Sequence, residues 1–137
     1  MSDARQFRYT SFQNAEGQIL MRPYLPLTLA YNNKALSVSG LLDTGADVNV
    51  LPYEIGLQPG AVWTEHKNRF TLSGNMAGYE ARRIILSGVI DNFAPLKLAF
   101  AWVQAPNVPL ILGRVNFFME FSVCFFASEN RFQIQPK

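Results

Sequence analysis

The chain has 137 residues, of which 49% are hydrophobic and 16% charged, and its formal net charge is +2. This length predicts a single domain, residues 1–137, that buries its own core and leaves no room for a second catalytic domain. Lysine and arginine are scattered rather than clustered, so we expect neither a nucleic acid nor a membrane among the partners.

The single cysteine and the N-terminus bear on where the protein works. Cys124 is the only cysteine, which excludes an intrachain disulfide, and its apolar neighbours predict a core filler. The first six residues lack the apolar segment of a signal peptide, and no uninterrupted apolar run approaches the roughly 20 residues of a membrane span. We therefore expect a cytoplasmic protein.

The N-terminal region predicts two strands. Residues 5–12 alternate loosely between polar and apolar side chains, and residues 14–17 have turn chemistry, so residues 1–17 are predicted to form an edge strand or an N-terminal arm. Residues 19–31 follow as a strand, in which Pro23 and Pro26 are typical of an edge or a bulge.

A hairpin and a short apolar strand come next. Asn and Lys at residues 32–34 favour a tight turn, because Asn tolerates a positive φ, and residues 35–42 form the return strand. Residues 47–51 predict a further short strand, and the proline that follows favours a helical turn over residues 53–57. The composition of residues 61–72 favours β structure.

The next segment predicts a glycine-hinged loop between strands. Residues 74–78 form this loop, residues 79–86 the returning strand, and Ser and Gly at 87–88 a break. Residues 96–103 alternate well and predict another strand, which ends at a proline-rich turn, residues 105–109.

The C-terminal part predicts one short helix and a closing hairpin. Residues 114–121 place apolar side chains at helical spacing. Residues 122–126 and 131–135 then alternate as two strands around a polar turn. The chain as a whole predicts an all-β protein, a mostly antiparallel β-barrel with one helix.

The segment with the clearest chemistry is residues 41–52, where Asp43-Thr44-Gly45 stands between two apolar runs. The first run delivers a carboxylate onto a turn that a strand holds rigidly. Thr44 supplies a hydroxyl that can fix the loop, and Gly45 lets the backbone bend where a side chain would crowd an attacking water. Peptide hydrolysis by paired aspartates needs this order of residues.

Two further segments give this short motif a context. Residues 110–114 read Leu-Ile-Leu-Gly-Arg, and the glycine-flanked loop lies between them and Asp43. Each feature alone has a plain alternative: a β-turn for Asp43-Thr44-Gly45, an exposed hairpin loop for residues 74–78, and two unrelated surface charges for Asp47 and Arg114.

Together these segments resemble the retropepsin-like aspartic proteases, whose hallmarks are an Asp-Thr/Ser-Gly turn between apolar runs and a later apolar-apolar-Gly-Arg. The resemblance implies a closed acid-protease barrel with one short helix after Gly113. The tail, residues 117–136, is longer than the viral pattern and is more similar to the cellular and bacterial members. Its closing hairpin is therefore a candidate for the dimer interface.

A single Asp-Thr-Gly implies two copies of the chain. The chemistry needs two carboxylates that share one proton, and the other acidic residues lack a comparable strand-turn setting. A two-fold homodimer places Asp43 opposite its own copy, as the resemblance also implies. The apolar content, with 11 Phe, suits the additional surface that such a dimer buries. We expect an aspartic endopeptidase that cleaves a polypeptide substrate with an activated water.

The resemblance assigns roles residue by residue. Asp43 is the catalytic carboxylate, Thr44 and Gly45 support the pair, and Asp47 and Arg114 form an intrachain ion pair. The substrate-binding walls are Ala46, Val50, Val108, Pro109 and Ile111, and the tip of the flap is Asn75, Met76 and Ala77. In one departure from the family, Val115 follows the Gly-Arg where an Asp or Asn is frequent, and Asn116 comes next.

Other functions have little support in the sequence. His66 stands in a polar neighbourhood with no second His or Cys at ligand spacing, so it is predicted to be a solvated strand residue and neither a metal nor another cofactor is expected. Two alternatives to the enzyme stay open. One is a catalytically silent barrel that binds extended peptides or serves as a dimerisation module, and the other is a structural β-domain with an accidental motif.

Overall fold

The computed structural model describes residues 3–72 and 74–137, without the side chains of residues 70 and 75. The strands are β1 (Arg5–Arg8), β2 (Thr10–Gln13), β3 (Ile19–Arg22), β4 (Tyr24–Tyr31), β5 (Lys34–Leu42), β6 (Asn49–Pro52), β7 (Arg69–Phe70), β8 (Ala81–Val89), β9 (Leu96–Val103), β10 (Ile111–Leu112), β11 (Phe121–Phe126) and β12 (Arg131–Pro136). The helices are α1 (Tyr53–Leu57) and α2 (Phe117–Glu120), with 3-10 turns η1 (Trp63–Glu65), η2 (Gly74–Met76) and η3 (Ala127–Glu129). None of the described helices has the length and apolar character needed to cross a membrane.

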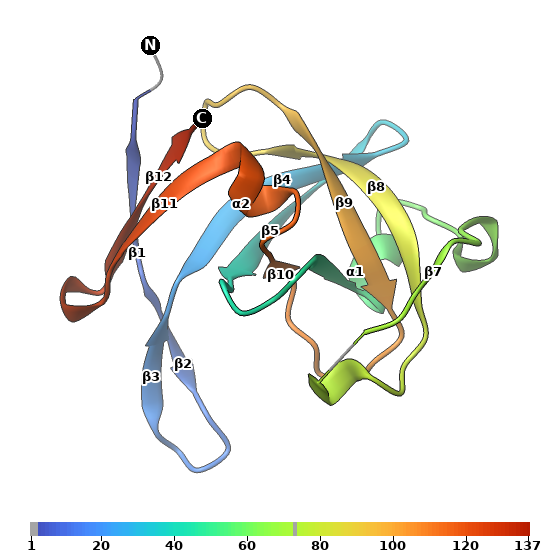
Figure 1. The fold of residues 1–137 in the computed structure, drawn as a ribbon, viewed down its shortest axis with the longest axis horizontal. Helices are drawn as coiled ribbons and strands as arrows, with labels where there is room; N and C mark the ends of the chain where they lie inside the picture. Colours follow the sequence, from blue (N-terminus) through green and yellow to red (C-terminus); the bar gives the residue numbers. More distant parts are fainter. Residues whose placement is uncertain (1–2, 73) are drawn as a thin grey trace.

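Six strands close into a barrel, in the order β4-β5-β10-β6-β9-β8, and β8 pairs back with β4 (Figure 1). Strand β7 extends this sheet beside β8. The pairs are antiparallel except β5 with β10 and β6 with β9, which run parallel. The all-β barrel predicted from the sequence is confirmed.

A separate three-stranded sheet, in the order β1-β12-β11, stands beside the barrel. Its inner face contributes Phe132 and Ile134, both fully buried, to the main core. Phe7 on β1 stacks on Phe132 with ring centroids 5.3 Å apart. The closing hairpin predicted for the C-terminus therefore exists, and the N-terminal strand completes it.

Two strands predicted as continuous are interrupted. The predicted strand at residues 5–12 divides at Tyr9, whose N–H donates to the carbonyl of Asn130, 2.7 Å away. The predicted strand at residues 19–31 divides at Pro23, which has no N–H to donate to a ladder. The two pieces between these breaks, β2 and β3, pair only with each other among the described strands.

Three further predictions were wrong. The break expected at residues 87–88 lies inside β8, because Gly88 leaves the space that the Leu98 side chain fills, 2.6 Å from where a Cβ would stand. Residues 61–72 contain η1 and only the two-residue strand β7. The predicted helix at 114–121 shortens to α2, since Asn116 adopts a φ of 78°, outside the helical region.

The aromatic core is built around Trp102 on β9, which is fully buried. Its Nε1 donates to the carbonyl of Tyr53, 2.9 Å away, and the Trp63 ring packs edge-on at 5.1 Å. His66, predicted to be a solvated strand residue, is half-buried against the same indole at 5.5 Å, and its Nε2 lies 3.2 Å from the Tyr31 hydroxyl. The polar neighbours of His66 in the sequence gave no sign of this.

Gly56 in α1 touches the indole of Trp102 so closely that a Cβ would lie 2.4 Å from Cε2. An alanine normally favours a helix by up to about 1 kcal/mol over glycine. Here the buried ring cannot withdraw, so we expect Gly56→Ala to lower the free energy of unfolding by about 1 to 3 kcal/mol. Urea denaturation measures the effect. The matched control is Gly78→Ala, whose Cβ would meet no atom within 4 Å and which should unfold as the wild type does; equal midpoints for the two variants would contradict this account of the core.

Candidate active site

The Asp43 loop begins where β5 ends and is held by β10. The Leu41 N–H donates to the carbonyl of Leu110 at 2.8 Å, and the Asp43 N–H donates to that of Leu112 at 3.1 Å. Within the loop, the Gly45 N–H donates to Oδ1 of Asp43 at 2.9 Å. The Asp43 carboxylate is half-buried and oriented by backbone groups, whereas Thr44 beside it is exposed.

Residue 113 must be glycine for the loop to sit here. A Cβ on Gly113 would lie 2.5 Å from the carbonyl oxygen of Val48, an approach to backbone that no side chain permits. Immediately after Gly113, the Arg114 N–H donates to the carbonyl of Ala46 at 2.9 Å. The segment that the sequence marked as Leu-Ile-Leu-Gly-Arg thus lies directly under the Asp-Thr-Gly turn.

Asn49 joins these two segments from inside the barrel, and the sequence did not single it out. It is fully buried, and its Oδ1 accepts from the Gly113 N–H at 2.8 Å. Its Nδ2 donates to the carbonyl of Ala99 and to Oδ1 of Asn116, each at 3.0 Å. An apolar-Asn-apolar run on a short strand was the available signal, since a polar residue between buried neighbours needs partners.

Asn116 makes the side-chain hydrogen bonds that Val115, directly after Gly-Arg, cannot make. Its Oδ1 also accepts from the Ala99 N–H at 3.0 Å, and its Nδ2 donates to the carbonyl of Lys97 at 3.2 Å. The left-handed backbone of Asn116 turns the side chain toward β9, so the bonding expected directly after Gly-Arg comes from the next residue.

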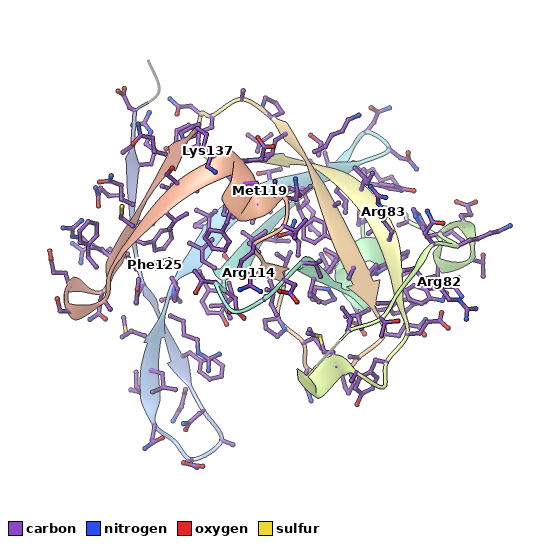
Figure 2. All side chains as sticks on the ribbon, viewed as in Figure 1. Arg82, Arg83, Arg114, Met119, Phe125 and Lys137 are labelled. Carbon is purple, nitrogen blue, oxygen red and sulfur yellow. The ribbon has the colours of Figure 1, made fainter. Side chains whose placement is uncertain are left out.

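Asp47 and Arg114 form a salt bridge between Oδ1 and Nη2. Their side chains are 70% and 57% exposed, so in the isolated chain the pair is a surface ion pair. Such pairs contribute about 0 to 1 kcal/mol, well below the several kcal/mol expected of a pair that is partly buried. In Figure 2 Arg114 lies apart from Arg82 and Arg83.

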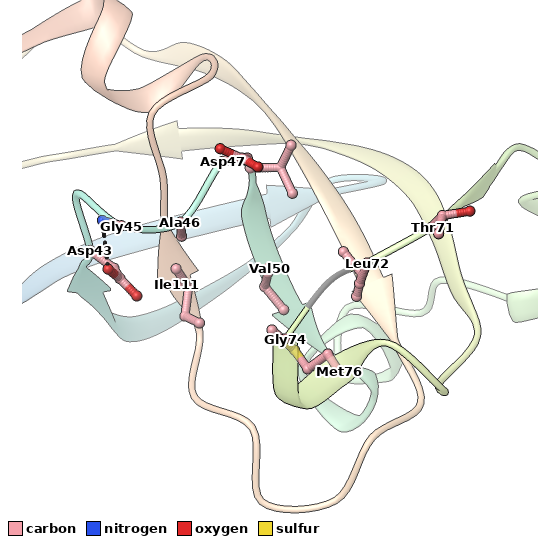
Figure 3. Close-up of a pocket in the computed structure, with 11 residues that line it drawn as sticks. Asp43, Gly45, Ala46, Asp47, Val50, Thr71, Leu72, Gly74, Met76 and Ile111 are labelled. Carbon is pink, nitrogen blue, oxygen red and sulfur yellow. Dashed lines mark hydrogen bonds between the residues drawn. The ribbon is translucent and has the colours of Figure 1, made fainter.

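Asp43 opens onto a pocket of about 440 Å³ (Figure 3). One wall comes from the Asp43 loop and its neighbouring strands, and the other from the segment around η2. The lining residues are Asp43, Gly45, Ala46, Asp47, Val48, Val50, Thr71, Leu72, Gly74, Met76 and Ile111. The sequence had singled out Ala46, Val50, Met76 and Ile111 as substrate walls or flap, but not Val48, Thr71 or Leu72.

A second pocket of about 270 Å³ continues from the first, since Met76 and Ile111 line both. Its other lining residues are Tyr79, Ala105, Pro106, Asn107, Val108 and Pro109. Val108 and Pro109 thus line this neighbouring pocket and not the one at Asp43. Ala77 lines neither of the two pockets, and the side chain of Asn75 lies outside the part of the chain that the structure describes.

The loop predicted as a flap has a different local form from a hairpin tip. Residues 74–76 form the 3-10 turn η2. Among the described residues the flanking strands β7 and β8 pair Arg69 with Arg82 and Phe70 with Ala81, and the Arg83 N–H donates to the carbonyl of Asn68 at 2.7 Å. The loop nevertheless carries Met76 over the pocket opposite Asp43 (Figure 3). Among the described residues, no group of three His, Cys, Asp or Glu side chains is placed to hold a metal ion.

Two solved structures resemble the chain. A retropepsin-like aspartic protease from Rickettsia conorii matches 99% of this chain and 94% of its own, with a TM-score of 0.65 and 18% sequence identity. The EIAV protease, in complex with an inhibitor, matches 68% of this chain and 82% of its own, with a TM-score of 0.42 and 22% identity. No family model and no curated protein sequence matched. The first of these structures shows that the chain has a retropepsin-like fold.

The buried bonds of Asn49 should stabilise the whole site region. In Asn49→Ala the Gly113 N–H and the Ala99 carbonyl lose a partner, and each such loss costs about 1 to 3 kcal/mol. We therefore expect the free energy of unfolding to fall by about 2 to 4 kcal/mol, measured by urea denaturation. Asn68→Ala, at an exposed position, is the matched control and should change it by less than about 0.5 kcal/mol. Similar losses in both variants would exclude the role given to Asn49.

Proposed function

We propose that the protein is an aspartic endopeptidase that hydrolyses peptide bonds as a homodimer, with Asp43 of each copy forming the catalytic pair. The observation that carries this proposal is the setting of Asp43: a half-buried carboxylate, fixed by the Gly45 N–H, at the edge of a pocket large enough for peptide side chains. Its retropepsin-like fold supports the same activity, since the neighbour from Rickettsia conorii is described as an aspartic protease.

The second carboxylate must come from another copy. Among the described residues Asp47 is the one other acid that lines the pocket, and it forms a salt bridge with Arg114. Figure 3 shows its carboxylate pointing in a different direction from that of Asp43. A two-fold axis beside the Asp43 loop brings two identical carboxylates together, because a symmetric interface matches each residue with its own copy.

In this dimer the two carboxylates share one proton, since two negative charges at hydrogen-bonding distance repel strongly. The ionised member takes a proton from a bound water as the water attacks the peptide carbonyl. The protonated member donates to the oxyanion that forms. Thr44, exposed beside the carboxylate, would brace the two loops across the axis, and no nucleophile on the protein is needed.

The extended substrate would cross both pockets, with Met76 above it and Ile111 beneath. Backbone hydrogen bonds give an extended peptide its affinity, and the pockets for alternate side chains give specificity. A catalytically silent barrel that binds such a peptide is the second candidate, and the shortness of the β7–β8 pairing favours it, since it leaves the loop over the site with little support.

Cleavage should depend on Asp43. We expect the purified protein to cleave an unfolded protein substrate between about pH 4 and 7, where a carboxylate pair sharing a proton is active. Asp43→Asn should abolish cleavage, because the pair can then neither activate the water nor exchange its proton. Asp91→Asn is the matched control: Asp91 has a φ of 50°, which Asn tolerates, and it lies in a distant loop paired with Arg5. Cleavage that survives in Asp43→Asn would refute the catalytic role of Asp43. Peptide binding without cleavage in the wild type would favour the catalytically silent barrel.

The lining of the pockets predicts which bonds are cut. Val50, Leu72, Met76 and Ile111 present apolar side chains to the substrate. We therefore expect apolar residues on both sides of the cleaved bond, since a charged side chain would lose part of its hydration against these apolar walls. Profiling with a peptide library measures this preference, and a preference for charged residues next to the bond would contradict the assigned walls.

A further inference from the structure

The hairpin formed by β2 and β3 is a separate two-stranded sheet that leaves the body of the molecule (Figure 1). Its register runs from Thr10 opposite Arg22 to Gln13 opposite Ile19. Isolated two-stranded hairpins are at best marginally stable in water, because they have no second layer against which to bury a face. The hairpin is not one of the barrel strands, so we looked for a contact that would stabilise it.

The tip of the hairpin is ordered by its own hydrogen bonds. Oδ1 of Asn14 accepts from the N–H groups of Glu16 and Gln18, at 3.0 and 2.9 Å. Nδ2 of Asn14 donates to Oε1 of Gln18 at 2.9 Å, and Gly17 takes the positive φ that closes the turn. The hairpin is thus shaped before any partner arrives, which reduces the ordering cost of binding.

The surface of β3 is apolar and exposed. Ile19, Leu20 and Met21 are 71%, 40% and 40% exposed. Successive residues of a strand point to opposite faces, so these three side chains make both faces of the hairpin apolar. The outer edge of β3 pairs with none of the other described strands, and its first three residues carry neither a charge nor a proline. Such edges are normally protected or paired.

The hairpin rises directly beside the Asp43 loop. The carbonyl of Pro23, at its base, accepts from the Leu42 N–H at 3.0 Å, and Leu42 precedes Asp43. In Figure 1 the hairpin and the η2 loop extend from the barrel in the same direction. Figure 2 places the exposed side chain of Phe125 on the hairpin's side of the molecule and Arg82 and Arg83 on the opposite side.

We propose that the β2–β3 hairpin is an arm that packs its apolar residues, Ile19 to Met21, on a second copy of this chain and thereby holds the two Asp43 loops together. This inference rests on the proposed function, which needs a second copy at Asp43. A copy that brings its own Asp43 to this loop must approach beside the hairpin. The hairpin residues do not line the pocket at Asp43, so the partner chain and not the peptide is the occupant.

Two-fold symmetry gives each active site two such arms. Each arm contributes Ile19, Leu20 and Met21 to the other copy, and the pair of contacts flanks the two carboxylates. The catalytic site is then incomplete without the arms, even though no arm residue touches the reacting atoms. In this arrangement the arms set the affinity of the dimer, and the loops set the geometry of the site.

The test measures assembly directly in the Asp43→Asn background, which prevents self-cleavage. Ile19, Leu20 and Met21 are replaced together by Thr, which retains strand propensity while removing apolar surface. Sedimentation equilibrium should show the dimer dissociation constant rising at least about tenfold, since buried apolar anchors dominate interface energies. Val62→Thr and Ile85→Thr remove apolar side chains elsewhere that are 45% exposed, close to the 40% of Leu20 and Met21, and should leave the dissociation constant unchanged.

A second measurement needs no substitution. Hydrogen exchange of the hairpin amides in the unaltered chain should slow at concentrations above the dissociation constant. Two results together would overturn the arm: an unchanged dissociation constant in the triple variant, and an exchange rate of the hairpin amides that does not depend on protein concentration. The proposed activity would still stand if the wild type cleaves. The triple variant is also made with Asp43 intact for cleavage assays. A raised KM in that protein, with an unaltered dimer dissociation constant, would overturn the arm in favour of substrate contact. A wild type that stays monomeric and inactive at every concentration would contradict both the proposed arm and the proposed Asp43 pair.

Discussion

The close approach between Gly113 and the backbone of Val48 is the constraint on which the site depends. The two segments come from distant parts of the chain, and each supplies backbone groups that the other satisfies. Asn49 fills the space behind them with an amide whose donors and acceptor are all used. Because leaving buried polar groups unpaired is costly, these bonds hold the loop that carries Asp43 in place. Catalytic carboxylates need such fixed positions.

Rigidity of this loop contrasts with the openness of its surroundings. Asp43 and Ala46 are half-buried, Thr44 and Gly45 are exposed, and the ion pair of Asp47 with Arg114 stands in water. In the proposed dimer each barrel would supply one half of the site and its partner copy the other half. The sequence contains a single Asp-Thr-Gly, so a two-fold dimer would complete the proposed pair.

Sequence patterns predicted the parts of this fold that local chemistry determines. The Asp-Thr-Gly turn at Asp43, the Gly-Arg segment at Gly113 and the alternation of β9 gave the barrel and its motif-bearing loops. The patterns failed where distant contacts decide. Gly88 looks like a break until Leu98 is placed against it, and His66 looks solvated until Trp102 is placed beside it. The partners of Asn49 come from segments about 50 to 67 residues away, which no local pattern reveals.

Two carboxylates at hydrogen-bonding distance repel each other when both are charged, so the Asp43 loops cannot by themselves hold the proposed dimer together. At neutral pH the repulsion must be offset by contacts remote from the carboxylates. Ile19, Leu20 and Met21 carry no charge. An arm of this composition would therefore hold the proposed dimer together at a pH at which the two Asp43 carboxylates repel each other.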